Sequence, residues 1–261
     1  MEERDAQSMK FVTLVDKDKF ELFALSAHYA GDVVVMKFGP EKITCNRICE
    51  DGNCLFSGEY IHTQSTIADD QIIHVSLSTC EIIKHLAQMP SGGLSIGVDN
   101  VGDFIMVVGG FKISLTPITP CPESDEVVKE EYPTIFNVDV EHLANMLTFT
   151  EADSKELSSI ILSVEDDGLY MANQDWTSSS ILHDVGTTAF VFFEKRTPGK
   201  FSVMVDYKAF KNILTTMSVY TSIKVAIGED MPLVLLGYDE QVRLAYMIAP
   251  QVEEEEENVS V

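Results

Sequence analysis

The chain has 261 residues, of which 45% are hydrophobic, so it can form one large domain or two ordinary ones with a buried core. It has no apolar run near the roughly 20 residues of a membrane helix, and its charged start, MEERDAQSMK, predicts no secretion signal. Five cysteines, an odd number, indicate free thiols in a reducing compartment. The formal charge of −24 argues against nucleic-acid binding unless the basic side chains gather on one face.

The first half of the chain predicts two copies of one unit, a strand followed by a helix and three more strands. In the first copy, residues 9–14 predict a strand and residues 17–29 a helix with Phe20, Phe23 and Ala27 on one stripe. Three β-type runs, DVVVMKFG, KITCNRIC and NCLFSGEYI, follow with turn signals between them. The second copy starts with the strand IIHVS, continues with a helix over residues 77–89 and ends with the strand FKISLT.

The middle of the chain, TPITPCPESDEVVKEEYP, is rich in proline and acidic residues, which predicts an extended linker. After it the unit appears twice more, with an additional strand, TAFVFFEKR, between the two copies. We therefore expect an N-terminal domain over residues 1–115, a connector over 116–133, a C-terminal domain over 134–250 and a disordered acidic tail over 251–261.

The four helices begin near residues 17, 77, 140 and 207, a spacing of roughly sixty residues that indicates a repeat architecture. Each start has a residue that can cap the helix N-terminus, namely Asp16 or Asp18, Ser78, Asp139 and Asp206. The predicted fold class is α+β. It has two similar domains, each with two βαβββ units that place two helices on one face of a curved antiparallel sheet.

Several short motifs in the last third of the chain resemble the sliding clamp family, proliferating cell nuclear antigen. They are Met231-Pro232-Leu233, Arg243-Leu244, Ile248-Ala249-Pro250 with the glutamate run after it, and Asp206-Tyr207 at the start of the last helix. The resemblance implies the DNA-clamp fold, in which three subunits close head to tail into a ring around duplex DNA, with helices inside and sheets outside. Such a ring slides on DNA and tethers DNA polymerase, with no enzymatic activity and no cofactor.

The resemblance also implies where DNA, partner proteins and neighbouring subunits bind. The inner helix faces offer Lys17, Lys19, Lys84, His85, Lys208 and Lys211 as sequence-independent phosphate contacts. DNA polymerase, a clamp loader and other replication and repair proteins would insert a short motif at Ile48, Ile118, Val127, Pro232, Met247, Ile248, Ala249 and Pro250. Strand 111–116, with Phe111, Ile113 and Leu115, would pair with strand 178–183 of the next subunit, with Ser178, Ser180, Ile181 and Leu182.

The third helix departs from the family's pattern because it offers His142, Asn145 and Thr148 but no lysine or arginine. This thin basic lining supports an alternative to the homotrimer, a subunit of a heterotrimeric checkpoint-type clamp. The expected compartment is the nucleus for a eukaryotic source or a virus that replicates there, and the cytoplasm for an archaeal source.

A carboxylate-based hydrolase is a remote alternative from another class, and it requires a pocket that raises the pKa of one Asp or Glu. The sequence has no phosphate-binding glycine loop and no H-E-x-x-H. Cys45, Cys49 and Cys54 alternate with strand residues and are interpreted as small core side chains, so we predict no metal site.

Overall fold

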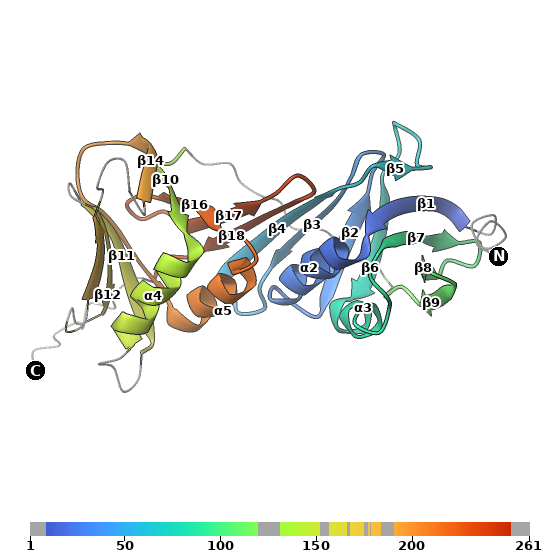
Figure 1. Cartoon of the computed structure of the whole chain (residues 1–261), viewed down its shortest axis with the longest axis horizontal. Coiled ribbons are helices and arrows are strands. Elements are labelled where there is room, and N and C mark those ends of the chain that lie inside the picture. The colour runs from blue at the N-terminus through green and yellow to red at the C-terminus, as the bar shows by residue number, and fades with distance from the viewer. Residues whose placement is uncertain are drawn as a thin grey trace, which may run out of the picture. The chain divides into compact units, whose positions relative to one another are not determined.

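The computed structural model describes residues 9–119, 131–151, 157–165, 168–174, 177, 179–183 and 191–251 (Figure 1). The chain divides into two compact units. The first comprises residues 1–130 with Leu236–Tyr246, and the second comprises residues 131–235 with 247–261. Each unit is described by itself.

The first unit contains two copies of the predicted βαβββ pattern. In chain order its elements are β1 (Met9–Asp16), α2 (Lys17–His28), β2 (Val33–Phe38), β3 (Lys42–Ile48), β4 (Cys54–Ile61), the short β5 (Gln64–Ser65), β6 (Ile73–Ser78), α3 (Thr79–Leu86), β7 (Gly93–Asp99), β8 (Phe104–Val108) and β9 (Phe111–Leu115). The second predicted helix is shorter than expected. Ser78 ends β6 and caps α3 through the Glu81 N–H, and after Leu86 the chain continues in turns.

The second unit repeats the pattern with one extra strand. Its elements are β10 (Thr134–Asp139), α4 (Val140–Glu151), β11 (Ser159–Glu165), β12 (Gly168–Asn173), β13 (Ser179–His183), β14 (Val191–Arg196), β15 (Phe201–Asp206), α5 (Tyr207–Met217), β16 (Ser222–Ile227), β17 (Leu233–Tyr238) and β18 (Val242–Ile248). The additional strand predicted from TAFVFFEKR is confirmed as β14, which pairs with β10. The chain passes between the two units within β17 and again within β18.

The strands pair in a way that interlocks the two copies in each unit. In the first unit, β1 pairs with β7 and β6 pairs with β2, so the first strand of each copy joins the sheet of the other. The second unit does the same, with β10 against β16 and β15 against β11. Neither copy completes a sheet alone, so each copy needs its neighbour. This mutual dependence is the physical reason for the repeat in the sequence.

The segment Leu236–Tyr246 lies in the predicted C-terminal domain by sequence but packs in the first unit. Its part of β18 lies beside β4, and the Ile61 N–H donates to the Gln241 carbonyl at 2.7 Å. The buried Tyr246 hydroxyl donates to the Ser26 carbonyl at 2.9 Å, and its ring lies 5.2 Å from that of Phe56. These contacts join residues about two hundred positions apart, so local sequence patterns do not predict them.

α2, α3 and α5 are capped at their starts, and the helices are held along one side by apolar burial. The carboxylates of Asp16 and Asp206 accept backbone N–H groups of the first turns of α2 and α5, which confirms these predicted caps. On α2 the fully buried Phe20 and Phe23 pack edge-on against Tyr60 of β4, at 6.1 and 6.3 Å between ring centroids. Each such ring contributes about 1.5–3 kcal/mol through burial alone.

Both ends of the predicted linker are packed rather than free. The Ile118 N–H donates to the Ser76 carbonyl at 2.9 Å, so this end runs beside β6. At the other end the Tyr132 side chain is buried and the Pro133 carbonyl accepts the Thr197 N–H. Residues 120–130, between these ends, lie outside the described part of the chain.

The pairing of β1 with β7 predicts the effect of adding one methyl group. A Cβ at Gly97 of β7 would lie 2.1 Å from the Phe11 carbonyl oxygen of β1. Gly97→Ala should therefore lower the free energy of unfolding by about 1–3 kcal/mol or more, measured by urea denaturation. Gly93→Ala is the matched control, because nothing lies within 4 Å of its added Cβ in the same strand. Equal stability of the two variants would contradict the β1–β7 register.

Candidate nucleic-acid interface and edge strands

The predicted phosphate-binding cations of the first unit differ sharply in availability. Lys17 is buried, and its ammonium contacts the carboxylates of Glu21 at 2.6 Å and Asp18 at 3.3 Å. The hydrogen bond to Glu21 is the main reason that the pKa of Lys17 is raised, despite the opposing effect of burial. The Lys19 ammonium is bound to the carboxylate of Asp239. Both charges are thus neutralised within the unit.

Lys84 and His85 lie near the end of α3. Lys84 is exposed and His85 half-buried. Among the described residues, no carboxylate forms an ion pair with Lys84. Of the four basic residues predicted on the first unit's helices, Lys84 is therefore the one best placed to meet an external phosphate.

In the second unit, α5 carries one paired and one unpaired lysine. The Lys211 ammonium lies 3.0 Å from the Glu151 carboxylate of α4 and 2.7 Å from the Tyr207 hydroxyl, which itself donates to Glu151 at 2.6 Å. Lys208 is exposed, with no ion pair in the described part of the chain. The sequence did not predict that Tyr207 and Glu151 contact Lys211. The position of Tyr207, one helical turn before Lys211, is a local signal for the first contact, but Glu151 is on another helix and has no such signal.

Burial raises the pKa of Glu151, but the hydrogen bonds from Tyr207 and Lys211 outweigh it and hold that pKa below its usual range. The same contacts raise the pKa of Lys211. The three side chains therefore form a small charged network that joins α4 to α5, and at neutral pH its carboxylate and ammonium are both ionised.

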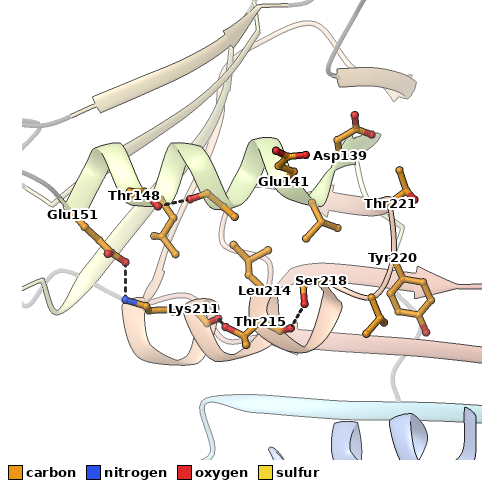
Figure 2. A pocket seen from close by; sticks show the side chains of 14 residues that line it. Asp139, Glu141, Thr148, Glu151, Lys211, Leu214, Thr215, Ser218, Tyr220 and Thr221 are labelled. Atoms are coloured by element: carbon orange, nitrogen blue, oxygen red, sulfur yellow. Dashed lines mark hydrogen bonds and ion pairs between the residues drawn. The ribbon is translucent and has the colours of Figure 1, made fainter. Parts of the chain in front are cut away.

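A cavity of about 700 Å³ lies between α4 and α5 (Figure 2). Its lining combines carboxylates with hydroxyls and aliphatic side chains: Asp139, Val140, Glu141, Ala144, Leu147, Thr148, Glu151, Lys211, Leu214, Thr215, Ser218, Val219, Tyr220 and Thr221. Figure 2 shows Lys211 as the basic side chain reaching toward Glu151 across the space between the helices. The predicted cap Asp139 is 3.5 Å from the His142 imidazole.

This cavity does not suit the hydrolase alternative. A general acid at neutral pH needs a carboxyl whose pKa is raised, as in the pairs of carboxylates that share a site. The hydrogen bonds from Tyr207 and Lys211 hold the pKa of the Glu151 carboxyl in this lining below its usual range, which is the opposite of what a general acid needs. Its charge is held by Lys211 and is not available for proton transfer.

The two strands predicted at the subunit contact are both sheet edges. β9 ends the order β5-β1-β7-β8-β9, and β13 ends the order β13-β12-β11-β15. On β9 the Phe111 side chain is 57% exposed and Ile113 is half-buried, whereas Leu115 is buried in the chain's own core and cannot offer its side chain to another subunit. An edge strand leaves one row of backbone N–H and C=O groups without a neighbour in the sheet.

On β13, Ser180, Ile181 and Leu182 are half-buried, and the Ser180 hydroxyl donates to the Met146 carbonyl of α4 at 3.3 Å. Ser178 lies outside the described residues. The predicted pairing of β9 with β13 stays a prediction, but the strand positions that it requires are present.

The residues predicted to bind partner motifs fall in both units. In the first unit, Ile48 ends β3 with 44% of its surface exposed, and Ile118 is half-buried. The second unit holds Pro232, Met247, Ala249 and Pro250, which are half-buried, and Ile248, which is fully buried. Val127 lies outside the described residues, as does the tail from residue 252. The predicted docking site stays a prediction.

Two further sequence expectations concern cysteines and the membrane. Cys45 and Cys54 are buried and Cys49 is partly buried, in line with their interpretation as packed side chains of a hairpin. Among the described helices, none has the length and apolar character needed to cross a membrane.

The Glu151 network predicts how one substitution changes a pKa. Removing the ammonium in Lys211→Met should raise the pKa of the Glu151 carboxyl, measured by an NMR pH titration. A depressed pKa stabilises the fold above the unfolded pKa and loses that contribution as the pH falls through the folded pKa. The stability gap between wild type and variant should therefore be largest near neutral pH and shrink in acid. Lys208→Met is the matched control, and an equal shift of the Glu151 pKa in both variants would contradict the network.

Comparison with known proteins identifies the fold. No protein-family model matches the sequence, and no curated protein matches it. Among solved structures, the A. fulgidus PCNA bound to the C-terminal region of FEN-1 has a TM-score of 0.80 at 12% identity, covering 94% of this chain and 100% of that one. PCNA from Thermococcus kodakaraensis has a TM-score of 0.79 at 14% identity, covering 93% of this chain and 100% of that one. Proliferating Cellular Nuclear Antigen from Entamoeba histolytica has a TM-score of 0.78 at 15% identity, covering 94% and 100%. The chain has the fold of proliferating cell nuclear antigen over nearly its whole length.

Proposed function

We propose that this protein is a DNA sliding clamp: three copies close into a ring around duplex DNA and hold DNA polymerase and other replication and repair proteins on it. In this role the protein is a processivity factor and not an enzyme. The observation that carries the proposal is the fold, because the chain matches the full length of three PCNA structures with TM-scores of 0.78–0.80. The C-terminal motifs of the sequence support it independently.

Ring closure is supported by the two edge strands. Each subunit offers β9 and β13, so a head-to-tail contact uses the β9 edge of one copy and the β13 edge of the next. Backbone hydrogen bonds between two five-residue strands, with Phe111 covered by the neighbouring copy, would remove both exposed edges. Closure after three copies ends the assembly as a ring.

The charge of the helices suits weak, sequence-independent contact. Lys84 and Lys208 stay available for phosphates, whereas Lys17, Lys19 and Lys211 are paired within the chain. With a formal charge of −24 on the whole chain, few phosphates can be neutralised per subunit, so the salt dependence of binding should be shallow and should come from these lysines. A ring that encloses DNA is retained by its topology and does not need tight contacts.

Partner recognition would use a short peptide motif. In the A. fulgidus structure the C-terminal region of FEN-1 is bound to PCNA. We propose that partners of this chain bind similarly through a short motif, with contacts to the half-buried Pro232 and Met247 of the second unit. The protein would act wherever the DNA is replicated, in the nucleus of a eukaryote or of cells infected by a virus that replicates there, or in the cytoplasm of an archaeon.

A heterotrimeric, checkpoint-type clamp stays the second candidate. The observation in its favour is α4, which has no lysine or arginine and places Glu141 and Glu151 on the cavity side. In a heterotrimer another subunit would supply positive charge that this chain lacks. The solution mass of the isolated protein separates the two candidates.

Light scattering over a range of concentrations should give a mass three times the 29.0 kDa of one chain. Phe111→Asp places a charge on the predicted β9–β13 contact and should shift the mass to that of the monomer. Ile72→Asp is the control, because Ile72 is 65% exposed in the same unit and precedes β6, which lies in a different sheet from β9. A strict monomer for the wild-type protein would exclude the homotrimer and favour the heterotrimeric clamp.

Enclosure of DNA is tested by threading. The protein is mixed with a linear duplex that carries biotin at both ends, and streptavidin is added either before or after it. A ring should remain on the DNA at high salt only when the ends are blocked after loading, and it should leave once the duplex is cut. Equal retention of the protein for both orders of streptavidin addition would indicate ordinary electrostatic binding. No retention in either order would contradict the clamp.

Removal of one available lysine should weaken DNA binding in a salt-dependent way. For Lys84→Ala and Lys208→Ala, the slope of log K against log salt, from fluorescence anisotropy, should fall in magnitude by about 0.9 for each lost phosphate contact. Lys37→Ala on β2 changes the net charge equally but lies on a sheet, and it should leave the slope unchanged. An equal effect of all three variants would show that total charge, and not helix placement, governs binding.

A further inference from the structure

Three side chains with metal-binding chemistry meet in the first unit, where α2 ends and α3 begins. His28 is the last residue of α2, Asp32 follows four residues later, and Cys80 is the second residue of α3. The Cys80 sulfur lies 3.5 Å from Asp32 Oδ1 and 3.8 Å from His28 Nδ1, and that nitrogen lies 3.3 Å from Asp32 Oδ1. All three are at least partly exposed, so an ion can reach them from solvent.

A fourth residue, Thr79, holds these three in place. Thr79 is fully buried, and its backbone N–H donates to the Asp32 carbonyl at 2.8 Å. Its hydroxyl lies 3.1 Å from the Gly31 carbonyl oxygen and 2.9 Å from His28 Nδ1. Thr79 thus contacts the His28 imidazole and also binds the turn that carries the Asp32 carboxylate. These contacts orient the two ligands before any ion is bound.

The distances match the edges of a tetrahedral zinc site. With bonds of about 2.3 Å to sulfur, 2.0–2.1 Å to nitrogen and 2.0–2.2 Å to oxygen, a tetrahedral ion separates its ligands by about 3.4–3.6 Å. The three separations here, 3.3, 3.5 and 3.8 Å, lie within a few tenths of an ångström of these edges. His28 Nδ1 can bind the ion only by giving up its contact with the Thr79 hydroxyl, whereas His28 Nε2, at 3.9 Å from the sulfur, can bind the ion while Nδ1 stays on Thr79.

We propose that His28, Asp32 and Cys80 form a binding site for a divalent transition metal, with Zn²⁺ as the best fit. Thiolate, imidazole and carboxylate together select zinc over magnesium or calcium, which prefer oxygen ligands alone. On binding, the Cys80 thiol loses its proton to solvent and the sulfur lone pair forms the bond to the ion. The fourth position faces solvent and takes a water molecule.

The site serves a purpose separate from the ring and the DNA contacts. The ion ties the end of α2 to the start of α3, the two helices that carry the first unit's predicted DNA-facing side chains. It also offsets the repulsion between a thiolate and the Asp32 carboxylate.

The test uses the full-length protein and Co²⁺ as a spectroscopic substitute for Zn²⁺. Wild type should bind one Co²⁺ per chain with a thiolate-to-metal charge-transfer band and tetrahedral d–d bands, and Zn²⁺ should displace it. Cys80→Ser should abolish the charge-transfer band, and His28→Gln should weaken Zn²⁺ binding, measured by calorimetry, by more than about tenfold. Zn²⁺ should raise the Tm of wild type but not of Cys80→Ser.

Cys49→Ser is the matched control, since Cys49 is another accessible thiol of the same unit. It should keep the wild-type spectrum. Loss of the band in Cys49→Ser with retention in Cys80→Ser would place the ion at the β3–β4 hairpin and overturn the proposal. Absence of any stoichiometric Co²⁺ or Zn²⁺ binding by wild type would overturn it as well, and would leave the cluster as a set of hydrogen bonds around Thr79.

Discussion

The exchange of first strands between neighbouring βαβββ copies is the constraint on which the rest of each unit depends. Pairing of β1 with β7 and of β6 with β2 means that each copy supplies its first strand to the other copy's sheet. The helix that follows each exchanged strand is thereby brought beside its sister helix. α2 and α3 lie together for this reason, as do α4 and α5 (Figure 1). The apolar face of α2, which carries Phe20 and Phe23, is then buried against strands of the same unit.

Helix pairing also decides which charges are available. Lys17 and Lys19 of α2 and Lys211 of α5 lie close to carboxylates, so their charges are neutralised within the chain. In an acidic protein this outcome is expected, because carboxylates outnumber ammonium groups more than two to one. The proposed clamp would therefore hold DNA by enclosure and contact it weakly. The same helix junction gathers His28, Asp32 and Cys80, which belong to α2, its following turn and α3.

The sheets leave β9 and β13 as edges that the described part of each unit does not cover. Exposed edges favour association, and proteins generally blunt them with charges, bulges or covering segments. Here Phe111 is exposed on β9 instead, which is costly in an isolated chain and useful at an interface. A closed ring uses both edges once per subunit, so the proposed assembly removes the features that would otherwise promote open-ended aggregation.

Local patterns were sufficient for the elements themselves. Apolar spacing predicted the four helices, Asp16, Ser78 and Asp206 were recognised as caps, and the repeated strand runs and turn signals predicted the βαβββ order. These features depend on residues within about one helical turn or one strand, so the sequence alone determines them. The composition of the linker predicted a domain boundary, but it did not predict that Ile118 and Tyr132 are packed at the two ends of the linker.

Tertiary structure decided which residues can act. Lys19 meets Asp239, which is 220 positions away, and Tyr207 meets Glu151, which is 56 positions away. Cys80 lies beside His28, 52 positions away in sequence. Cys45, Cys49 and Cys54 of the β3–β4 hairpin, by contrast, are close together in sequence. Such contacts arise from strand exchange and helix packing, whose partners carry no short-range signature. The sequence by itself therefore determined the kind and order of the elements, and only the fold decided which charges stay available and which ligands meet.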